Sequence, residues 1–198
     1  MPQKKTNLSG LNILLGVSGG VAAYKAVDLA SKLTASGARV NTVMTENACR
    51  FIGPKSFEAV TNSAVYITLW NAGEEHKISH ISLADWADII VVAPATANII
   101  GKIANGICDD LLSTTLCACW PLIKSGATLL APAMNNNMWT NPSVQRNVKT
   151  VKDMDFQLIG PQVGPLACGR EGIGRMAEPQ DILEAIDKIA SKIKRKKK

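Results

Sequence analysis

Apolar residues along this 198-residue chain fall into short unbroken runs, separated by segments in which they recur every three or four positions. Such runs are typical of buried strands and such spacing is typical of helices, so the pattern predicts alternating strands and helices. Strands that are apolar along nearly their whole length indicate a parallel sheet covered on both faces. The predicted strands span 11–17, 38–44, a weaker 64–69, 88–94, 127–134 and 156–160.

Helices are expected between these strands, and several begin or end at recognisable residues. Thr96 is suited to cap a helix that runs to Asn105, and Asp109 or Asp110 to cap one that reaches about Trp120. Segment 160–176 contains so much glycine that we expect a loop there, and 70–80 is a polar loop. The remaining predicted helices follow Gly20 up to Gly37, then span 47–52, 56–60, 142–154 and 179 onward.

The length fits one domain, and the chain shows no repeat. The net charge of +6 has a local origin, because six of the 22 basic residues lie between 192 and 198 and leave 16 against 16 acidic ones. A neutral body argues against a nucleic-acid groove. We therefore expect an N-terminal extension over 1–10, a folded domain over 11–190 and a basic tail over 191–198.

The sequence also bears on the cellular compartment. The first ten residues are polar and no apolar run is long enough to cross a bilayer, so neither a secretory signal nor a membrane segment is expected. The five cysteines are odd in number and lack C-x-x-C spacing, which is typical of reduced thiols in the cytoplasm.

A glycine turn follows the first strand. Gly19 and Gly20 let the backbone approach a ligand closely, and the N–H groups of the next helix would favour a phosphate there. The glycines are out of register for a dinucleotide fingerprint, and Lys25 is not followed by the Ser or Thr of a P-loop. A mononucleotide-like site and a plain strand-to-helix turn both remain open. Glu46, placed like the ribose-binding acid of nicotinamide-binding folds, keeps that alternative open too.

Polar residues follow two later strands, and ligands of open parallel sheets bind beyond the carboxyl ends of the strands. An Ala-Pro-Ala sequence ends the strands before 96 and before 134 and leaves Thr96, Asn98 and Asn135 at the rim of the sheet. Hydroxyl and amide groups suit a flat ring system with polar edges.

Five ordered motifs between Leu11 and about Ile189 make the chain resemble the homo-oligomeric flavin-containing cysteine decarboxylases. The resemblance implies an α/β, flavodoxin-like (Rossmann-like) subunit, a three-layer sandwich with a parallel sheet that binds FMN. The motifs are GGVAAYK at 19–25, HISLA at 80–84, PATAN at 94–98 with KIANG at 102–106, PAMNNNMW at 132–139, and ACG at 167–169 followed by GRMAEP at 174–179.

This resemblance implies a reaction, which is the FMN-dependent decarboxylation of 4′-phospho-N-pantothenoylcysteine to 4′-phosphopantetheine in coenzyme A biosynthesis. In the chemistry proposed for the family, the flavin oxidises the substrate thiol to a thioaldehyde, CO2 leaves, and the hydride returns. Family members are cytoplasmic trimers, or dodecamers of trimers, with the site at a subunit interface. Many bacterial relatives are fused to a phosphopantothenoylcysteine synthetase.

The motifs also imply roles for individual residues. His80 corresponds to the catalytic histidine that manages the thiol proton, Asn135 to the amide that holds the substrate carboxylate, and Cys168 to the late proton donor on a flap. Met138 and Ala167 are expected beside Asn135 against the substrate. The implied cofactor-binding residues are Gly19, Gly20, Val21, Thr45, Phe51, Thr96, Ala97, Asn98 and Ile99.

Each of these residues also has a purely structural interpretation. His80 beside apolar neighbours can serve packing, Asn135 can serve a turn, and Cys168 can be inert. His76 and His80 have metal-ligand spacing but no third ligand, so no metal is expected. A flavin prenyltransferase has a different loop set, whereas a peptidyl-cysteine decarboxylase and a non-catalytic FMN-binding regulatory protein stay open as alternatives.

Overall fold

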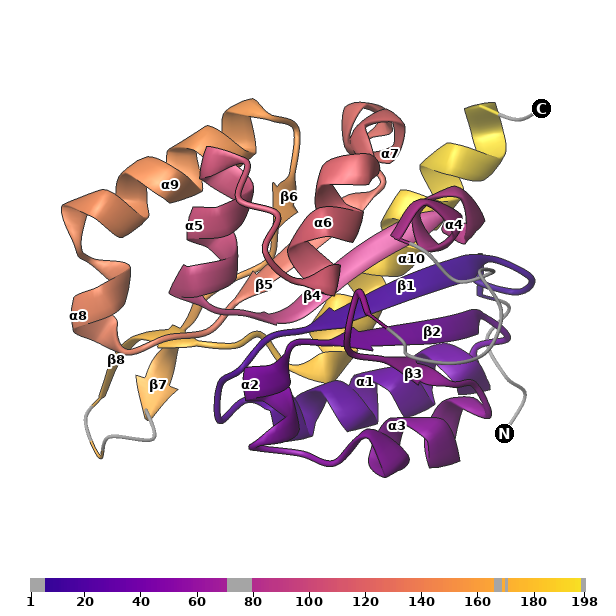
Figure 1. Cartoon of the computed structure of the whole chain (residues 1–198), viewed down its shortest axis with the longest axis horizontal. Coiled ribbons are helices and arrows are strands. Elements are labelled where there is room, and N and C mark those ends of the chain that lie inside the picture. The colour runs from indigo at the N-terminus through magenta and orange to yellow at the C-terminus, as the bar shows by residue number, and fades with distance from the viewer. Residues whose placement is uncertain (1–5, 71–79, 166–168, 170, 197–198) are drawn as a thin grey trace.

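The computed structural model describes residues 6–70, 80–165, 169 and 171–196. Six strands form one sheet in the order β3-β2-β1-β4-β5-β6, and each neighbouring pair is parallel (Figure 1). The predicted α/β class with a parallel sheet is confirmed. The strands are β1 (Asn12–Val17), β2 (Arg39–Met44), β3 (Val65–Tyr66), β4 (Ile89–Ala95), β5 (Thr128–Pro132) and β6 (Gln157–Leu158).

The sheet is buried on both faces. Successive side chains of a strand point to opposite faces, and β4 shows the result: Val91 lies in one apolar cluster and Val92 in the other. All seven residues of β4 are buried. A strand with two buried faces has no polar side, which explains the unbroken apolar runs in the sequence.

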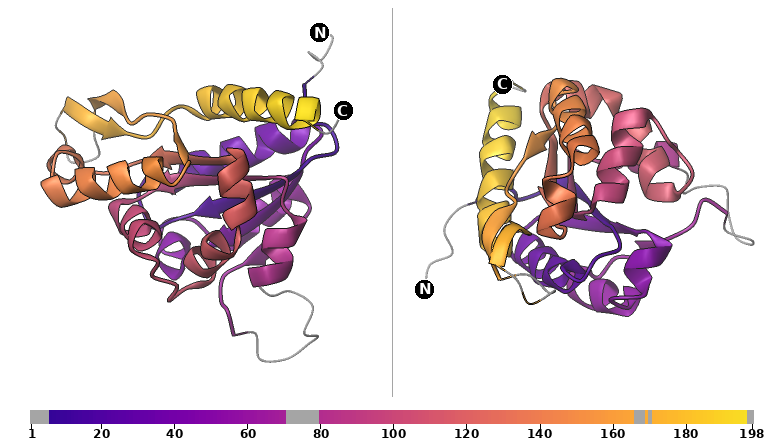
Figure 2. Two further views of the ribbon diagram at one scale, coloured as in Figure 1. Left: turned by 90° about the horizontal axis from the view of Figure 1, so that it is seen from above. Right: turned by 90° about the vertical axis from the view of Figure 1, so that its left-hand side faces the viewer.

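Helices cover the two faces as separate layers. One face carries α1 (Ala23–Ala35), α2 (Glu46–Cys49), α3 (Pro54–Thr61) and α10 (Pro179–Lys196), and Figure 2 shows α10, in yellow, lying along it. The opposite layer consists of α4 (His80–Trp86), α5 (Ala97–Asn105), α6 (Leu111–Ala118), α7 (Trp120–Ser125) and α9 (Pro142–Asp153). The short helix α8 (Asn136–Trp139) follows β5. In the described part of the chain, no helix combines the length and apolar character needed to span a bilayer.

The two predicted helix caps on this second layer are confirmed. The Thr96 hydroxyl accepts a hydrogen bond from the Ile99 N–H at the start of α5, and Asp110 forms a capping box with Ser113 at the start of α6. The predicted end at Trp120 is wrong, because α6 ends at Ala118 and Pro121 lies in the first turn of a new helix, α7. Proline lacks the N–H that would continue the first helix.

The prediction of an irregular loop over 160–176 is also wrong. Strands β7 (Gln162–Pro165) and β8 (Glu171–Arg175) form a separate antiparallel pair within it. Glycine supplies backbone conformations that other residues avoid, with φ of 158° at Gly164 and 150° at Gly174, so this pair depends on the glycines that suggested a loop. Helices α4 and α8 lie where the sequence predicted no element.

Both ends of the described chain pack on the domain. Leu8 is fully buried, and the Asn7 side chain and N–H donate hydrogen bonds to Asp187 of α10. Helix α10 continues to Lys196, into the segment predicted as a tail. The proposed boundaries at 10 and 190 stay a prediction.

The packing of α1 against the sheet gives a first test of this core. Leu29 is fully buried in the same cluster as Ile186 of α10. Leu29→Ala should lower the free energy of unfolding by about 2–5 kcal/mol, because it removes buried apolar contacts and leaves a cavity. The measurement is urea-induced unfolding followed by circular dichroism. Asp28→Ala is the matched control on the exposed side of α1. It loses only the surface ion pair with Lys32 and should cost under about 1 kcal/mol; equal effects of the two changes would contradict this packing.

Candidate functional site

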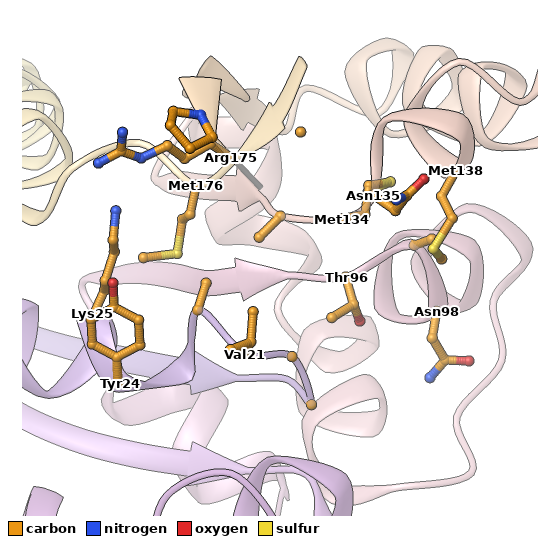
Figure 3. A pocket seen from close by; sticks show the side chains of 17 residues that line it. Val21, Tyr24, Lys25, Thr96, Asn98, Met134, Asn135, Met138, Arg175 and Met176 are labelled. Carbon is orange, nitrogen blue, oxygen red and sulfur yellow. The ribbon is translucent and has the colours of Figure 1, made fainter. Parts of the chain in front are cut away.

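A cavity of about 790 Å³ lies where β1, β4 and β5 end (Figure 3). Its size is within the range of roughly 300–1,000 Å³ found for small-molecule sites. Its walls are the turn between β1 and α1 with the start of α1, the turn between β4 and α5, the loop after β5 with α8, and the β7–β8 pair with the residue after it. This cavity therefore lies at the carboxyl edge of the sheet, as expected for a ligand site of an open parallel sheet.

Most of the predicted site residues meet at this cavity, but not all. His80 begins α4, which ends just before β4, and Figure 1 shows α4 at the amino end of that strand, away from the cavity. Thr45 caps α2, Phe51 is 54% exposed, and Ile99 is buried in the core. Ala167 and Cys168 lie outside the described residues. The predicted residues that line the cavity are Gly19, Gly20, Val21, Thr96, Ala97, Asn98, Asn135 and Met138.

The turn between β1 and α1 presents bare backbone to the cavity. A Cβ on Gly19 would lie 2.5 Å from Cβ of Asn47, and one on Gly20 would lie 3.3 Å from Cγ2 of Thr96. Side chains therefore fit poorly at either position. The turn leads directly into α1, whose first turn carries no acidic residue, so the positive end of the helix dipole is left to an anionic ligand.

Ser18 ties this turn to the neighbouring one. Ser18 is only 2% exposed. Its hydroxyl donates a 2.7 Å hydrogen bond to the Pro94 carbonyl and lies 3.0 Å from the Thr96 hydroxyl. The Thr96 N–H in turn donates to the Ser18 oxygen at 3.1 Å. Two walls of the cavity, from β1 and β4, are therefore fixed relative to each other by one buried hydroxyl.

The loop after β5 and strand β8 form the opposite wall. The Met134 N–H donates a 2.9 Å hydrogen bond to the Gly174 carbonyl, and a Cβ on Gly174 would lie 2.1 Å from the Met134 carbonyl oxygen. Only glycine fits this contact. Asn135 follows at once, and its side-chain oxygen accepts a 2.8 Å hydrogen bond from the Asn137 N–H. That bond fixes the orientation of an amide at the cavity wall.

Two cations lie toward one end of the cavity, and the amides of Asn98 and Asn135 lie toward the other (Figure 3). Glu178 accepts hydrogen bonds from Lys25 Nζ at 2.9 Å and from Arg175 at 2.5 Å. The Lys25 hydrogen bond is the main reason that the pKa of Glu178 lies below its ordinary value, and Arg175 adds to it. Two positive charges against one negative charge leave this end suited to an anion.

The sequence did not assign these cations to the site. From the sequence, Lys25 does not fit a P-loop and belongs to the GGVAAYK motif, and Arg175 belongs to the GRMAEP motif, with no role for either residue. One pattern in the sequence could have indicated an ion pair here: Arg175 and Glu178 are three residues apart just before a helix. Among the residues that the structure describes, no three His, Cys, Asp or Glu side chains are grouped to hold a metal ion.

Comparisons with known proteins agree with this architecture. A family model described as Flavoprotein matches residues 1–191. The chain is 48% identical over 181 residues to the coenzyme A biosynthesis bifunctional protein CoaBC of Bacillus subtilis (strain 168), covering 91% of this chain and 43% of that protein. It therefore spans less than half the length of this curated relative.

Solved structures are similar over nearly their whole length. A PPC decarboxylase variant complexed with pantothenoylaminoethenethiol has a TM-score of 0.77 and 34% identity, covering 89% of this chain and 96% of that one. The FMN-dependent cysteine decarboxylase SpaF has a TM-score of 0.76 and 32% identity, covering 93% and 99%. The predicted flavodoxin-like fold is confirmed.

The Ser18 hydroxyl offers a test of how the cavity is held together. Ser18→Ala removes the buried hydrogen bond to the Pro94 carbonyl and leaves the partly buried Thr96 N–H without its oxygen partner, so it should lower the free energy of unfolding by about 1–3 kcal/mol. Chemical denaturation followed by fluorescence measures this difference. Ser31→Ala, an exposed serine on α1, is the control and should change it by no more than about 0.5 kcal/mol. Equal stability of the two variants would show that the hydroxyl does not tie the turns together.

Proposed function

Because this chain belongs to the Flavoprotein family, we propose that it is the FMN-dependent decarboxylase that converts 4′-phospho-N-pantothenoylcysteine to 4′-phosphopantetheine in coenzyme A biosynthesis. The relative and the first solved structure described above carry names from this reaction. The single observation that supports it best is one cavity with a glycine turn, an oriented amide and a cationic end.

The residues present fit FMN. The bare turn at Gly19 and Gly20 suits its phosphate, and the apolar part of the lining suits its ring system. Thr96 and Asn98 provide hydroxyl and amide groups for the polar edge of that ring. Bound FMN supplies a reversible two-electron oxidation of the substrate thiol, which needs no external oxidant over the full cycle.

Asn135 is proposed to bind the substrate carboxylate through its amide nitrogen. A neutral amide binds the anion without the strong stabilisation of a cation, which would oppose loss of CO2. Lys25 and Arg175 are proposed to bind the substrate phosphate at the other end. Met138 and Ala167 remain predicted substrate contacts, and Cys168 remains the predicted proton donor.

The position of His80 on α4, away from the cavity of its own chain, supports a site shared between subunits. We propose that the imidazole which manages the thiol proton comes from a neighbouring copy in a homotrimer, or in a dodecamer of trimers. Large apolar side chains stand exposed around the cavity in the single chain, with Val21 at 56%, Tyr24 at 60% and Met138 at 47%. A group of such residues is typical of a surface that another protein covers. Thr45 and Phe51 do not line the cavity of the single chain, and they remain predicted flavin contacts.

The bifunctional CoaBC relative suggests which enzyme works together with this chain. Because the chain matches 43% of such a protein, we propose a phosphopantothenoylcysteine synthetase, fused or separate, as the partner that makes the substrate. A cytoplasmic location follows from the proposed pathway.

Substrate choice tests the proposed reaction. The purified protein should be yellow with FMN and should release CO2 from phosphopantothenoylcysteine without added reductant. Offered this substrate and a peptide with a C-terminal cysteine at equal concentration, it should consume the former at least about 10-fold faster, since charge-assisted hydrogen bonds contribute roughly 1.5–3 kcal/mol. Mass spectrometry of both products gives the ratio. Arg175→Gln should reduce this preference without slowing the peptide reaction. A colourless protein, or a preference for the peptide, would overturn the proposal.

Mixed assemblies test the shared site. His80→Asn and Asn135→Asp should each abolish CO2 release while flavin absorbance remains. Co-expressed in equal amounts, they should regain about a quarter of wild-type activity if each site takes the two residues from different chains of a symmetric assembly. The measurement is the activity of the whole co-expressed mixture, in which the two kinds of chain assemble at random. An inactive mixture would place both residues in one chain's site, and active single variants would remove them from the chemistry.

A further inference from the structure

A second, smaller cavity of about 170 Å³ lies between α5, α6 and α7. Its walls are mainly apolar and include Ile103, Leu116 and Phe156. Two thiols, those of Cys108 and Cys117, also line it, and the proposed reaction uses neither. The cavity leaves room for both sulfur atoms to rotate, which a close-packed core would prevent.

The chain brings these two thiols together on one side of α6. Cys108 lies before this helix and folds back on it, with its sulfur 4.0 Å from the Ser113 carbonyl oxygen and its own carbonyl accepting a 3.2 Å hydrogen bond from the Thr114 hydroxyl. In an α-helix the N–H of residue 117 is directed at that same carbonyl of residue 113. Both side chains line the one small cavity, and the Cys117 thiol lies near enough to that of Cys108 to raise its pKa.

The surroundings hold this pair in place. Lys102 of α5 forms ion pairs of 2.6 Å with both Asp109 and Asp110, which anchor the segment directly after Cys108. Asp110 also caps α6, the helix that carries Cys117. The two sulfurs are therefore attached to backbone that is already fixed, so little conformational freedom is lost when they join.

The two thiols of the pair differ in exposure from Cys119, which lies two residues after Cys117 in the chain. Cys108 and Cys117 are exposed, whereas Cys119 is buried and burial raises its pKa to about 12. Partial burial, the Cys117 contact and the nearby carboxylates raise the pKa of Cys108 as well. Both members of the pair are exposed, so a small oxidant dissolved in the solvent can reach either sulfur.

We propose that Cys108 and Cys117 are an oxidisable dithiol, which closes to an intramolecular disulfide when a low-molecular-weight disulfide supplies the oxidising equivalents. One thiolate attacks that disulfide, forms a mixed disulfide and releases one small thiol. The second cysteine then attacks the protein sulfur of the mixed disulfide and releases the other small thiol. Two protein thiols lose two electrons and two protons, and one small disulfide is reduced to two thiols.

The test is thiol mapping of the full chain after incubation with oxidised glutathione. We expect a product lighter by two hydrogens, with peptides containing residues 108 and 117 cross-linked under non-reducing conditions and separated by dithiothreitol. Cys108→Ser should abolish the cross-link and trap glutathione on Cys117. Cys49→Ser, which removes a half-buried thiol elsewhere, is the matched control and should leave the cross-link unchanged.

Three outcomes would overturn the proposal. Stable glutathione adducts on both cysteines would show that the sulfurs cannot meet, and a cross-link between chains would assign them to separate contacts. Unmodified thiols under conditions that oxidise free cysteine would show that the pair is not reactive. Because the readout is the mass of the protein, the result does not depend on the decarboxylase activity.

Discussion

Burial of the central sheet on both faces is the constraint on which the site depends. Strands β1, β4 and β5 carry apolar side chains toward both layers of helices, and their only polar side chains are Asn12 and Thr128 at the amino ends of β1 and β5. Hydroxyls, amides and free backbone can gather only where these strands end. Because the strands are parallel, they end at one edge, and the turns after them converge on one cavity. The position of the site is thus a consequence of the core.

Glycine then decides how close the walls of the cavity come. At Gly19, Gly20 and Gly174 the neighbouring atoms lie where a Cβ would be or in tight contact with it. The contact at Gly174 joins β8 to the Met134 carbonyl, and so brings a segment from near the C-terminus against the loop after β5. Larger residues would hold these segments apart and widen the cavity. Rigid, closely spaced walls are what a flat ring system needs in order to be held in one orientation.

The sequence predicted what local pattern determines. Continuous apolar runs gave the main strands to within a residue or two, and the Thr96 and Asp110 caps were correct because a cap depends on residues within one turn. The β7–β8 pair escaped prediction because its glycines look like a loop until the partner strand and the Met134 contact are known. Eight predicted site residues line the cavity because they lie directly after strands. His80 does not, because its motif says nothing about where α4 packs.

The charges at the cavity show what sequence patterns leave out. Lys25 and Arg175 are 150 positions apart in the chain, and only the fold brings them to one carboxylate, Glu178. Because the pKa of Glu178 is lowered in the folded chain, its ionisation stabilises the fold above its unfolded pKa, and this contribution is lost as the pH falls through the lowered value. At neutral pH the carboxylate is therefore charged and offsets the repulsion between the two cations. It holds them beside the cavity with one positive charge in excess, so an arriving anion meets donors that are already oriented and need no costly rearrangement.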